Sequence, residues 1–591
     1  MTCSIMAPGM LYVTMQPAAA LNKAAFQDWY NNEHGPLRLR LSPQITNGFR
    51  YRALDLDTDR AADPKAHEWM AVYDLPEMSF LDSEEYLKLR SPPIQSSREQ
   101  SIRPDITINR RNFDEVRTWT SSSFSPLETL SSTNKEDNIL VATTCTVLSE
   151  SSLSEFNSWF EDEHISMISK IPGWLRSRRF IVSPTEGQTK HDYLALHEYT
   201  SAASLKSAEM AAVKDDPRTG DMMKYVGSTE RRVWKRYYTF GPAPRDLAPL
   251  RHEATSLYDS PSSFARCKTF PSHTAMTRRP ALESYITLSD GTVLPYRLEE
   301  GSSGDDIGPV IILVNSILTT WGIWNPFVTK FFDNPKNQHY RILRYNSRGR
   351  YSPCGRQSTS ITVDTLASDL VALLDALRIP AAAAAVGVSL GGVTVLAAAL
   401  KHSARIERFM ACDTSAASPA GNAKAWGERI EMSEREGATR KAVKVAAEET
   451  SESITIEMDG LLQEGEAIVG EELAEATTRR WFVPASYENA AQAQECDRVK
   501  TMVAQNSLQG FKRGVRALWE YDYKPLLKDY KGKGCFLVGG SDGALPKSMK
   551  EMASGLGADG TDLIIVEDAG HLPMVEKPHE VVAAVERLLA M

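Results

Sequence analysis

Residues 387–391 carry the pattern Gly-x-Ser-x-Gly, with Ser389 at its centre. An Ala/Val run precedes the pattern and an Ala/Leu-rich apolar segment follows it, which predicts a strand, a sharp turn and a helix. The two glycines leave room for a strained backbone that pushes the Ser389 hydroxyl out of the sheet. A serine held in this way can act as a nucleophile when a base lies within reach. Because the pattern arises by chance in long chains, the base must be sought elsewhere in the sequence.

Two further side chains follow strand-like runs late in the chain and would complete such a site. Asp542 comes just after one apolar run, and His571 comes after the last one. The order along the chain is therefore nucleophile, acid, base. His571 would take the proton of the Ser389 hydroxyl, while Asp542 would hold the imidazole in the required tautomer. Asp413 also ends a strand-like run, and it stays an alternative for the acid.

Acyl transfer also needs amide donors for the developing oxyanion, each worth roughly 3–4 kcal/mol. The amide of Leu390, which opens the helix after the nucleophile, is one candidate. We expect the other in the loop after an early apolar run, and favour the amide of Ile317. The aromatic residues of the region could line a substrate pocket or could equally pack in a core. The pocket candidates are Asn315, Ser316, Trp324, Trp481 and Trp519.

The elements that would position these residues lie in 282–591. Strand-like apolar runs alternate there with helical spacing, such as that of Leu366, Leu370 and Leu374. This alternation predicts an α/β fold with a mostly parallel sheet and chemistry at the carboxyl ends of its strands. A hairpin is expected at 284–298 and a helical cap at about 414–522. The other expected strands are at 310–314, 341–345, 382–387, 409–412, 535–539 and 563–567.

The first 240 residues contain an internal repeat. The run Phe-Gln-Asp-Trp-Tyr-Asn-Asn-Glu-His at 26–34 returns as Phe-Asn-Ser-Trp-Phe-Glu-Asp-Glu-His at 156–164. Strand-like runs before and after it repeat in the same order, so each copy reads strand, helix, strand, strand, helix, strand. This order is the ferredoxin-like topology. We expect one such domain at 1–125 and a second at 135–240, followed by a linker at 241–281.

The repeated helix ends on Glu-His in both copies, which makes His34 and His164 candidates for a second site. The alternative is that the aromatic residues pack the helix on the sheet while each histidine satisfies a local hydrogen bond. The Gly-Pro pair that follows His34 is replaced by Ile-Ser after His164. This difference argues against two equal sites.

Several motifs of the C-terminal half resemble those of the α/β hydrolases, and among them the 3-oxoadipate enol-lactonases. The resemblance covers about 282–591, roughly half the chain. It implies an α/β-hydrolase fold and a serine hydrolase that cleaves an ester, with a lactone or enol-lactone as the favoured substrate. In three places the chain departs from the family pattern: Leu318 replaces a glycine, Asn346 an aspartate and Arg350 a histidine. The motifs are Asn-Ser at 315–316, Trp-Asn-Pro at 324–326, Arg-Tyr-Asn-Ser-Arg-Gly-Arg at 344–350, Cys-Asp-Thr at 412–414, Arg-Trp-Phe-Val-Pro at 480–484 and Gly-His-Leu-Pro-Met-Val-Glu-Lys-Pro at 570–578.

The repeated N-terminal domains resemble the EthD-like branch of the dimeric α/β-barrel superfamily, in which two such units pack sheet to sheet. That resemblance implies assembly, including a homo-oligomer formed through these domains, or a role in shaping access to the pocket. It also suggests a place in polyketide-type secondary metabolism. Two other kinds of function are alternatives to ester hydrolysis. The same triad could serve a carbon–carbon bond hydrolase or an acyltransferase, or the chain could be a non-catalytic interaction protein.

Composition limits the partners that we expect. The net charge of −9 argues against nucleic acid or an anionic membrane as the main partner, and leaves a small-molecule substrate. The seven cysteines are dispersed without a Cys-x-x-Cys pair, which indicates reduced thiols and no metal site. No signal peptide or membrane-spanning run is evident, so a cytoplasmic protein that needs no cofactor is expected.

Overall fold

The computed structural model describes residues 7–55, 66–92, 94–130, 137–184, 191–251, 268–270, 279–301, 308–351, 360–441 and 464–591. The chain divides into two compact units, Met1–Pro242 and Ala243–Met591. Each unit has hydrophobic clusters of its own. Within the described ranges, no helix has the length and apolar character needed to cross a membrane.

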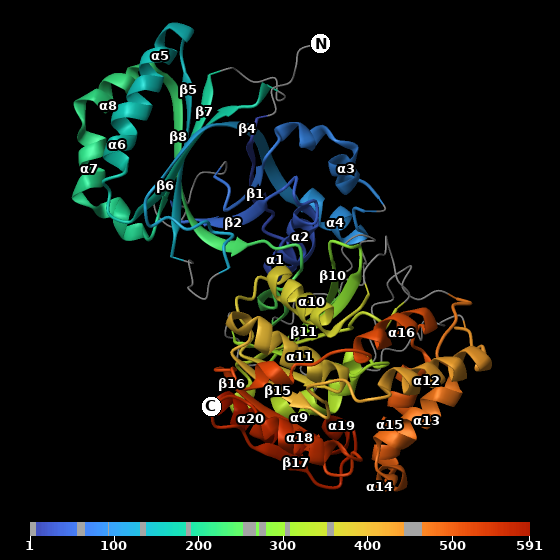
Figure 1. Cartoon of the computed structure of the whole chain (residues 1–591). Coiled ribbons are helices and arrows are strands. Elements are labelled where there is room, and N and C mark those ends of the chain that lie inside the picture. Colours follow the sequence, from blue (N-terminus) through green and yellow to red (C-terminus); the bar gives the residue numbers. More distant parts are fainter. Residues whose placement is uncertain are drawn as a thin grey trace. The chain divides into compact units, whose positions relative to one another are not determined.

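The first unit is built on a closed barrel of eight antiparallel strands in the order β1-β3-β2-β8-β5-β7-β6-β4 (Figure 1). Each half of the unit contributes four neighbouring strands, and the pairs β2–β8 and β4–β6 join the halves. The element order expected from the repeat is present in both halves. The strands are β1 (Gly9–Pro17), β2 (Asn47–Ala53), β3 (Trp69–Leu75), β4 (Ile106–Thr120), β5 (Ile139–Val147), β6 (Trp174–Val182), β7 (Asp192–Tyr199) and β8 (Val226–Thr239).

Alternation of side chains along the strands gives the barrel two apolar faces. On β1, Met10 and Tyr12 join a buried cluster to which all eight strands contribute. Leu11 and Met15 point the other way and join a cluster with Phe26 of the first helix. The inside of the barrel is therefore filled by side chains.

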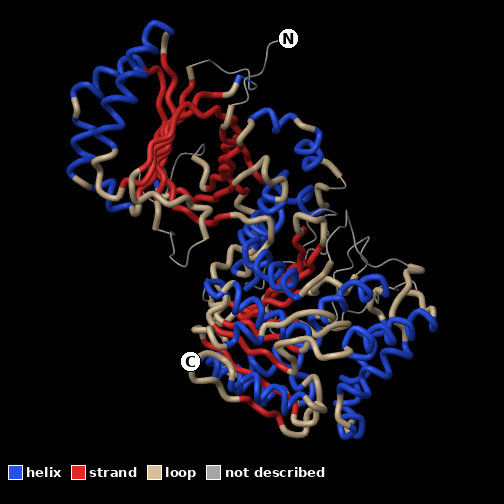
Figure 2. The backbone as a smooth tube through the Cα atoms, viewed as in Figure 1, coloured by secondary structure: helices blue, strands red, loops and turns tan. Residues whose placement is uncertain are grey.

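The helices of this unit lie outside the barrel (Figure 2). In each half the first helix continues through a π-helical turn that ends on the repeated histidine, at Tyr30–His34 and Trp159–His164. Such turns are uncommon and often mark functional sites. The helices are α1 (Lys23–Trp29), α2 (Gly35–Leu39), α3 (Glu84–Leu87), α4 (Ser97–Ile102), α5 (Glu150–Ser158), α6 (Ile165–Ile168), α7 (Ala208–Asp215) and α8 (Pro217–Met222).

The second unit contains one sheet in the order β17-β16-β15-β14-β12-β13-β11-β10-β9. The pairs from β13 through β17 are parallel, and the hairpin β10–β11 is antiparallel, as the sequence predicts. The apolar strands are buried in the core of the unit. Their bounds are β9 (Lys268–Phe270), β10 (Ala281–Thr287), β11 (Val293–Glu300), β12 (Val310–Val314), β13 (Arg341–Tyr345), β14 (Ala384–Val388), β15 (Arg408–Cys412), β16 (Lys533–Gly539) and β17 (Leu563–Val566).

Helices surround this sheet, and several of them form a cap between β15 and β16. Figure 1 shows α12, α13 and α15 gathered at one side of the unit, away from α18 and α20. Residues 442–463 of the expected cap lie outside the described residues. The helices are α9 (Asn325–Asp333), α10 (Val363–Ala376), α11 (Leu390–Lys401), α12 (Asn422–Glu436), α13 (Glu471–Trp481), α14 (Pro484–Glu488), α15 (Ala490–Ala504), α16 (Leu508–Gly514), α17 (Lys524–Leu527), α18 (Leu545–Ser554), α19 (Pro573–Glu576) and α20 (Pro578–Ala590).

Two described segments of the expected linker at 241–281 belong to the second unit. Leu247 and Leu250 are buried in the core of that unit. Strand β9 pairs with β10 and extends the edge of the sheet. Apolar residues spaced irregularly among prolines gave no periodic signal for this packing. The boundaries at 1–125 and 135–240 stay a prediction.

Candidate active site

Ser389 sits in a tight turn between β14 and α11. Its backbone has φ 59° and ψ −118°, a conformation that side chains disfavour. A Cβ on Gly387 would lie 2.2 Å from the carbonyl oxygen of Gly391, and one on Gly391 would lie 2.3 Å from that of Val314. The helix thus begins in contact with the strands, which only glycine permits at these two positions. The Ser389 side chain is partly exposed at the carboxyl edge of the sheet.

The loop after β12 approaches the first turn of α11. Ile317 and Leu390 both line one pocket, and Asn315 and Ser316 line it too. As the first residue of α11, Leu390 has an amide without a partner inside the helix. The loop and the helix start can therefore present amides toward a common space.

Leu318, one of the three departures from the expected motif pattern, has an unusual backbone conformation. Its φ is 66°, in the left-handed region that glycine adopts most readily. The Leu318 side chain is only 3% exposed, so the residue is buried although its backbone is strained. The guanidinium of Arg350 donates to the carbonyl oxygens of Leu318 at 3.4 Å and Met502 at 2.5 Å. Arg350 thereby ties the loop to helix α15 of the cap.

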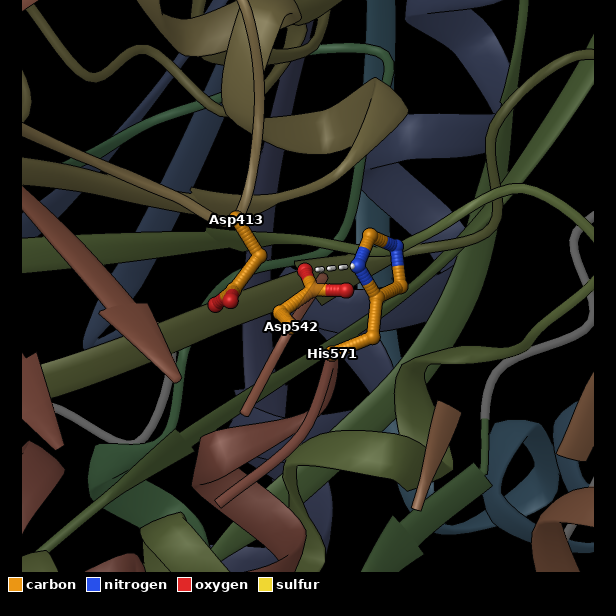
Figure 3. A group of neighbouring side chains, drawn as sticks. All are labelled: Asp413, Asp542 and His571. Carbon is orange, nitrogen blue, oxygen red and sulfur yellow. Dashed lines mark hydrogen bonds and ion pairs between the residues drawn. The ribbon is translucent and has the colours of Figure 1, made fainter. Parts of the chain in front are cut away.

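Asp542 and His571 meet at the same edge of the sheet. The Nδ1 atom of His571 lies 2.6 Å from Oδ2 of Asp542, the distance of a hydrogen bond (Figure 3). The side chains are 12% and 15% exposed, so solvent reaches both. Because Ser389, Asp542 and His571 follow β14, β16 and β17, parallel pairing brings all three to one edge.

The cap holds the histidine loop in place. The His571 ring stacks on Trp481 with centroids 5.6 Å apart, and its amide donates to the Trp481 carbonyl at 2.7 Å. Glu576 is buried and accepts from the Gly570 amide at 2.6 Å and the Val483 amide at 2.9 Å. Burial raises the pKa of Glu576. One carboxyl group thus links the loop that carries His571 to the cap.

Asp413, the alternative acid, lies on the far side of Asp542 from His571 in the view of Figure 3. Its Oδ1 accepts from the Gly539 amide at 2.8 Å. Burial, together with the neighbouring Asp542 carboxylate, holds the pKa of Asp413 well above its usual range. The hydrogen bond of the imidazole therefore goes to Asp542.

Ligand atoms of Asp413, Asp542 and His571 lie within 4.8 Å of one another, a spacing that also occurs at metal sites. The 2.6 Å between Nδ1 and Oδ2 is too short for two ligands of one cation, which stand roughly 3 Å apart at bond lengths of about 2.0–2.2 Å. The contact is better explained by a shared hydrogen.

The tryptophan candidates for the pocket have different surroundings. Trp324 is fully buried in the core and its ring lies 5.8 Å from that of Phe327. Trp481 contacts His571, as described above. Trp519 is partly exposed, with the Arg516 guanidinium 5.7 Å from its ring centroid. Trp324 is therefore a core residue, whereas Trp481 contacts a candidate catalytic side chain.

The two histidines of the N-terminal repeat are packed against aromatic rings. His34 lies 4.7 Å from the Trp29 ring, with Nδ1 3.3 Å from Oε1 of Glu99. His164 lies 4.8 Å from the Trp159 ring. Burial lowers the pKa of each imidazole to about 4. Both imidazoles are therefore neutral near pH 7. Their surroundings differ, because the Glu99 carboxylate lies beside His34.

Comparison with known proteins bears on the second unit. Residues 311–585 match the alpha/beta hydrolase family. The matched residues extend over the parallel strands β12 to β17 and the tight turn at Ser389. This half of the chain is an α/β hydrolase. Within the hydrolase unit, the match spans β12, the turn at Ser389, the cap and His571.

Curated relatives of the hydrolase unit include two proteins from Acinetobacter baylyi. The chain is 25% identical over 301 residues to 3-oxoadipate enol-lactonase 2, covering 50% of this chain and 95% of that protein. It is 26% identical over 299 residues to 3-oxoadipate enol-lactonase 1, covering 50% and 92%. The solved enol-lactonase of Burkholderia xenovorans LB400 is 24% identical, with a TM-score of 0.40, and covers 52% of this chain and all of that one.

Two residues of this site, Glu576 and Arg350, were not predicted as site residues, and a third, Asp413, was predicted only as an alternative acid. Glu576 belongs to the motif that contains His571, but its contact with the cap is long-range. Arg350 was visible only as a departure from a family pattern. Asp413 was weighed as a competitor of Asp542, whereas the structure places the two carboxyl groups side by side.

Proposed function

We propose that the hydrolase unit is a serine hydrolase that cleaves an ester through an acyl-enzyme. The observation that carries this proposal is the hydrogen bond between His571 and Asp542 at the sheet edge where Ser389 stands. In the reaction, the Ser389 hydroxyl attacks the ester carbonyl and passes its proton to Nε2 of His571. Asp542 keeps the imidazole oriented through Nδ1 and stabilises its positive charge.

The negative charge that forms on the carbonyl oxygen is stabilised by the amides of Ile317 and Leu390. The location of both residues at one pocket supports this pairing. Collapse of the tetrahedral intermediate expels the alkoxide, which takes the proton from His571. A water molecule then attacks the acyl group while His571 accepts its proton. When this second intermediate collapses, the bond between the acyl carbon and the Ser389 oxygen breaks, that oxygen takes the proton from His571, and the free acid leaves.

A lactone or enol-lactone is the substrate class that we favour. The two enol-lactonases of Acinetobacter baylyi align over 95% and 92% of their length, which supports this choice. In a lactone the leaving oxygen stays attached to the acyl group, so hydrolysis gives one product molecule. Leu318 and Arg350, two of the departures, line the pocket beside the start of α11.

We propose that the N-terminal unit is a tandem pair of ferredoxin-like domains of the EthD-like kind. The matching strand orders β4-β1-β3-β2 and β8-β5-β7-β6 support this reading. Its role is assembly into homo-oligomers or control of access to the hydrolase, with His34 and His164 as a candidate second site. Sedimentation of the full chain tests the assembly.

Replacement of Ser389 by alanine tests the proposed chemistry. Hydrolysis of an aryl ester and of simple lactones should fall to the uncatalysed level, while circular dichroism stays that of the wild type. Turnover at the wild-type rate would overturn the assignment. Reaction in ¹⁸O-labelled water separates hydrolysis from acyl transfer, because hydrolysis places solvent oxygen in the new carboxylate. Carbon–carbon cleavage would appear as turnover of vinylogous diketones in place of esters.

A further inference from the structure

The carboxyl group of Asp413 has an unusual environment. Asp413 directly follows β15 with φ 44°, is 1% exposed, and its carboxyl group accepts one hydrogen bond, from the Gly539 amide to Oδ1. Its other oxygen, Oδ2, is buried and takes no hydrogen bond from an amide or hydroxyl of the described residues. The Asp542 carboxyl group lies beside it.

Asp413 is buried beside the Asp542 carboxylate, and two adjacent negative charges repel each other, so one of the two groups binds a proton. The hydrogen bond from His571 Nδ1 favours the ionised form of Asp542. Asp413 accepts from the Gly539 amide, which favours its ionised form, but burial and the neighbouring carboxyl groups of Asp542 and Glu576 outweigh this and disfavour a negative charge there. The thiol of Cys412 is buried next to it, and the guanidinium of Arg480 interacts with Asp542. The proton therefore belongs on Asp413.

We propose that Asp413 is held as a neutral carboxylic acid whose Oδ2–H donates to the Asp542 carboxylate, and thus acts as a positioning residue for that acid. The catalytic consequence rests on the proposed function. A hydrogen bond from Asp413 fixes the orientation of Asp542 on the side opposite His571. It also disperses the negative charge of Asp542, which limits how strongly the imidazolium of His571 is stabilised.

Two substitutions distinguish a neutral Asp413 from a charged one. In Asp413→Asn, the amide oxygen can accept from Gly539 and the amide nitrogen can donate to Asp542, which reproduces a neutral acid. In Asp413→Leu, the donor is lost and the size is similar. The measurement is the acid limb of the pH profile of kcat/KM for an aryl ester, which reports the ionisation of His571 in the free enzyme.

We expect Asp413→Asn to leave the midpoint of the acid limb unchanged. Asp413→Leu should raise it by about 0.5–1 pH unit, because an undispersed Asp542 charge favours the imidazolium. If Asp413 were ionised, both substitutions would remove a negative charge and lower the midpoint by about one unit or more. A lower midpoint in either variant overturns the proposal. So does an unchanged midpoint in both, which would mean that Asp413 only fills space.

A measurement without substrate decides the protonation state directly. The infrared difference spectrum of the full-length wild type minus Asp413→Asn, at neutral pH, should contain the C=O stretch of a protonated carboxyl group. Carboxylate stretches in its place would overturn the proposal. Because this comparison needs only the wild type and Asp413→Asn, it stays decisive if Asp413→Leu fails to fold. If Ser389→Ala retained turnover, the proposed function would fail while this spectrum still reported on Asp413.

Discussion

Ser389 occupies a backbone conformation that glycine adopts at lower cost. At φ 59° and ψ −118°, a residue with a Cβ is strained by about 1–3 kcal/mol. Glycine removes most of this strain but lowers stability by about 0.4–1 kcal/mol through the entropy of the unfolded chain. Little packing is lost, because the side chain is partly exposed. Ser389→Gly should therefore exceed Ser389→Ala in free energy of unfolding by about 0.5–2 kcal/mol.

Hydrogen exchange read by mass spectrometry in a urea series measures this difference. Peptides from β14 and α11 report the unfolding of the hydrolase unit separately from that of the N-terminal unit. Ser389→Ala is the matched control, since it lacks the hydroxyl and keeps the strain. Both variants should be inactive on aryl esters. A Ser389→Gly variant no more stable than Ser389→Ala would refute the claim that the turn is strained.

Three further substitutions test the roles of Asp542, Glu576 and His34. Asp542→Asn should lower kcat on aryl esters about 10⁴-fold, because an amide favours the wrong imidazole tautomer, and near-normal kcat would contradict this role. In Glu576→Gln, the new side-chain N–H₂ group faces either the Gly570 amide or the Val483 amide, which both donate to the carboxylate in the wild type. The substitution should therefore lower the free energy of unfolding in urea by about 1–3 kcal/mol. An unchanged unfolding transition would show that these hydrogen bonds do not stabilise the protein. Burial lowers the pKa of His34 from 6.5 to about 4, so stability present above pH 6.5 is lost as the pH falls toward 4. The loss of stability that His34 causes at low pH is at most about 3 kcal/mol, and it should be absent in His34→Gln. If urea unfolding of the wild type and of His34→Gln showed the same pH dependence, His34 would not contribute.

Local patterns were enough to predict much of the hydrolase unit. Apolar runs such as 310–314 gave β12 with its observed bounds, because a strand buried on both faces has no polar positions. The glycines around Ser389 predicted the turn because a Cβ at either position would collide with backbone. The order of strands likewise brought Asp542 and His571 to one edge, where the structure shows them in contact.

Contacts between distant segments could not be predicted in this way. The repeat gave the element order of the N-terminal unit, but the pairs β2–β8 and β4–β6 that close the barrel depend on which free edges meet. The strained φ of Leu318 opposes the preference of leucine and is stabilised by burial. The adjacency of Asp413 and Asp542, and the link from Glu576 to the cap, also join residues far apart in sequence.

A fluorophosphonate probe tests whether Ser389 is an activated nucleophile. The probe reacts with a serine hydroxyl where a base and oxyanion donors activate it. We expect the full chain to gain one probe mass, peptide mapping to place it on Ser389, and Ser389→Ala to gain none. A folded wild-type protein that stays unlabelled, or that carries the label on another residue, would show that Ser389 is not the nucleophile.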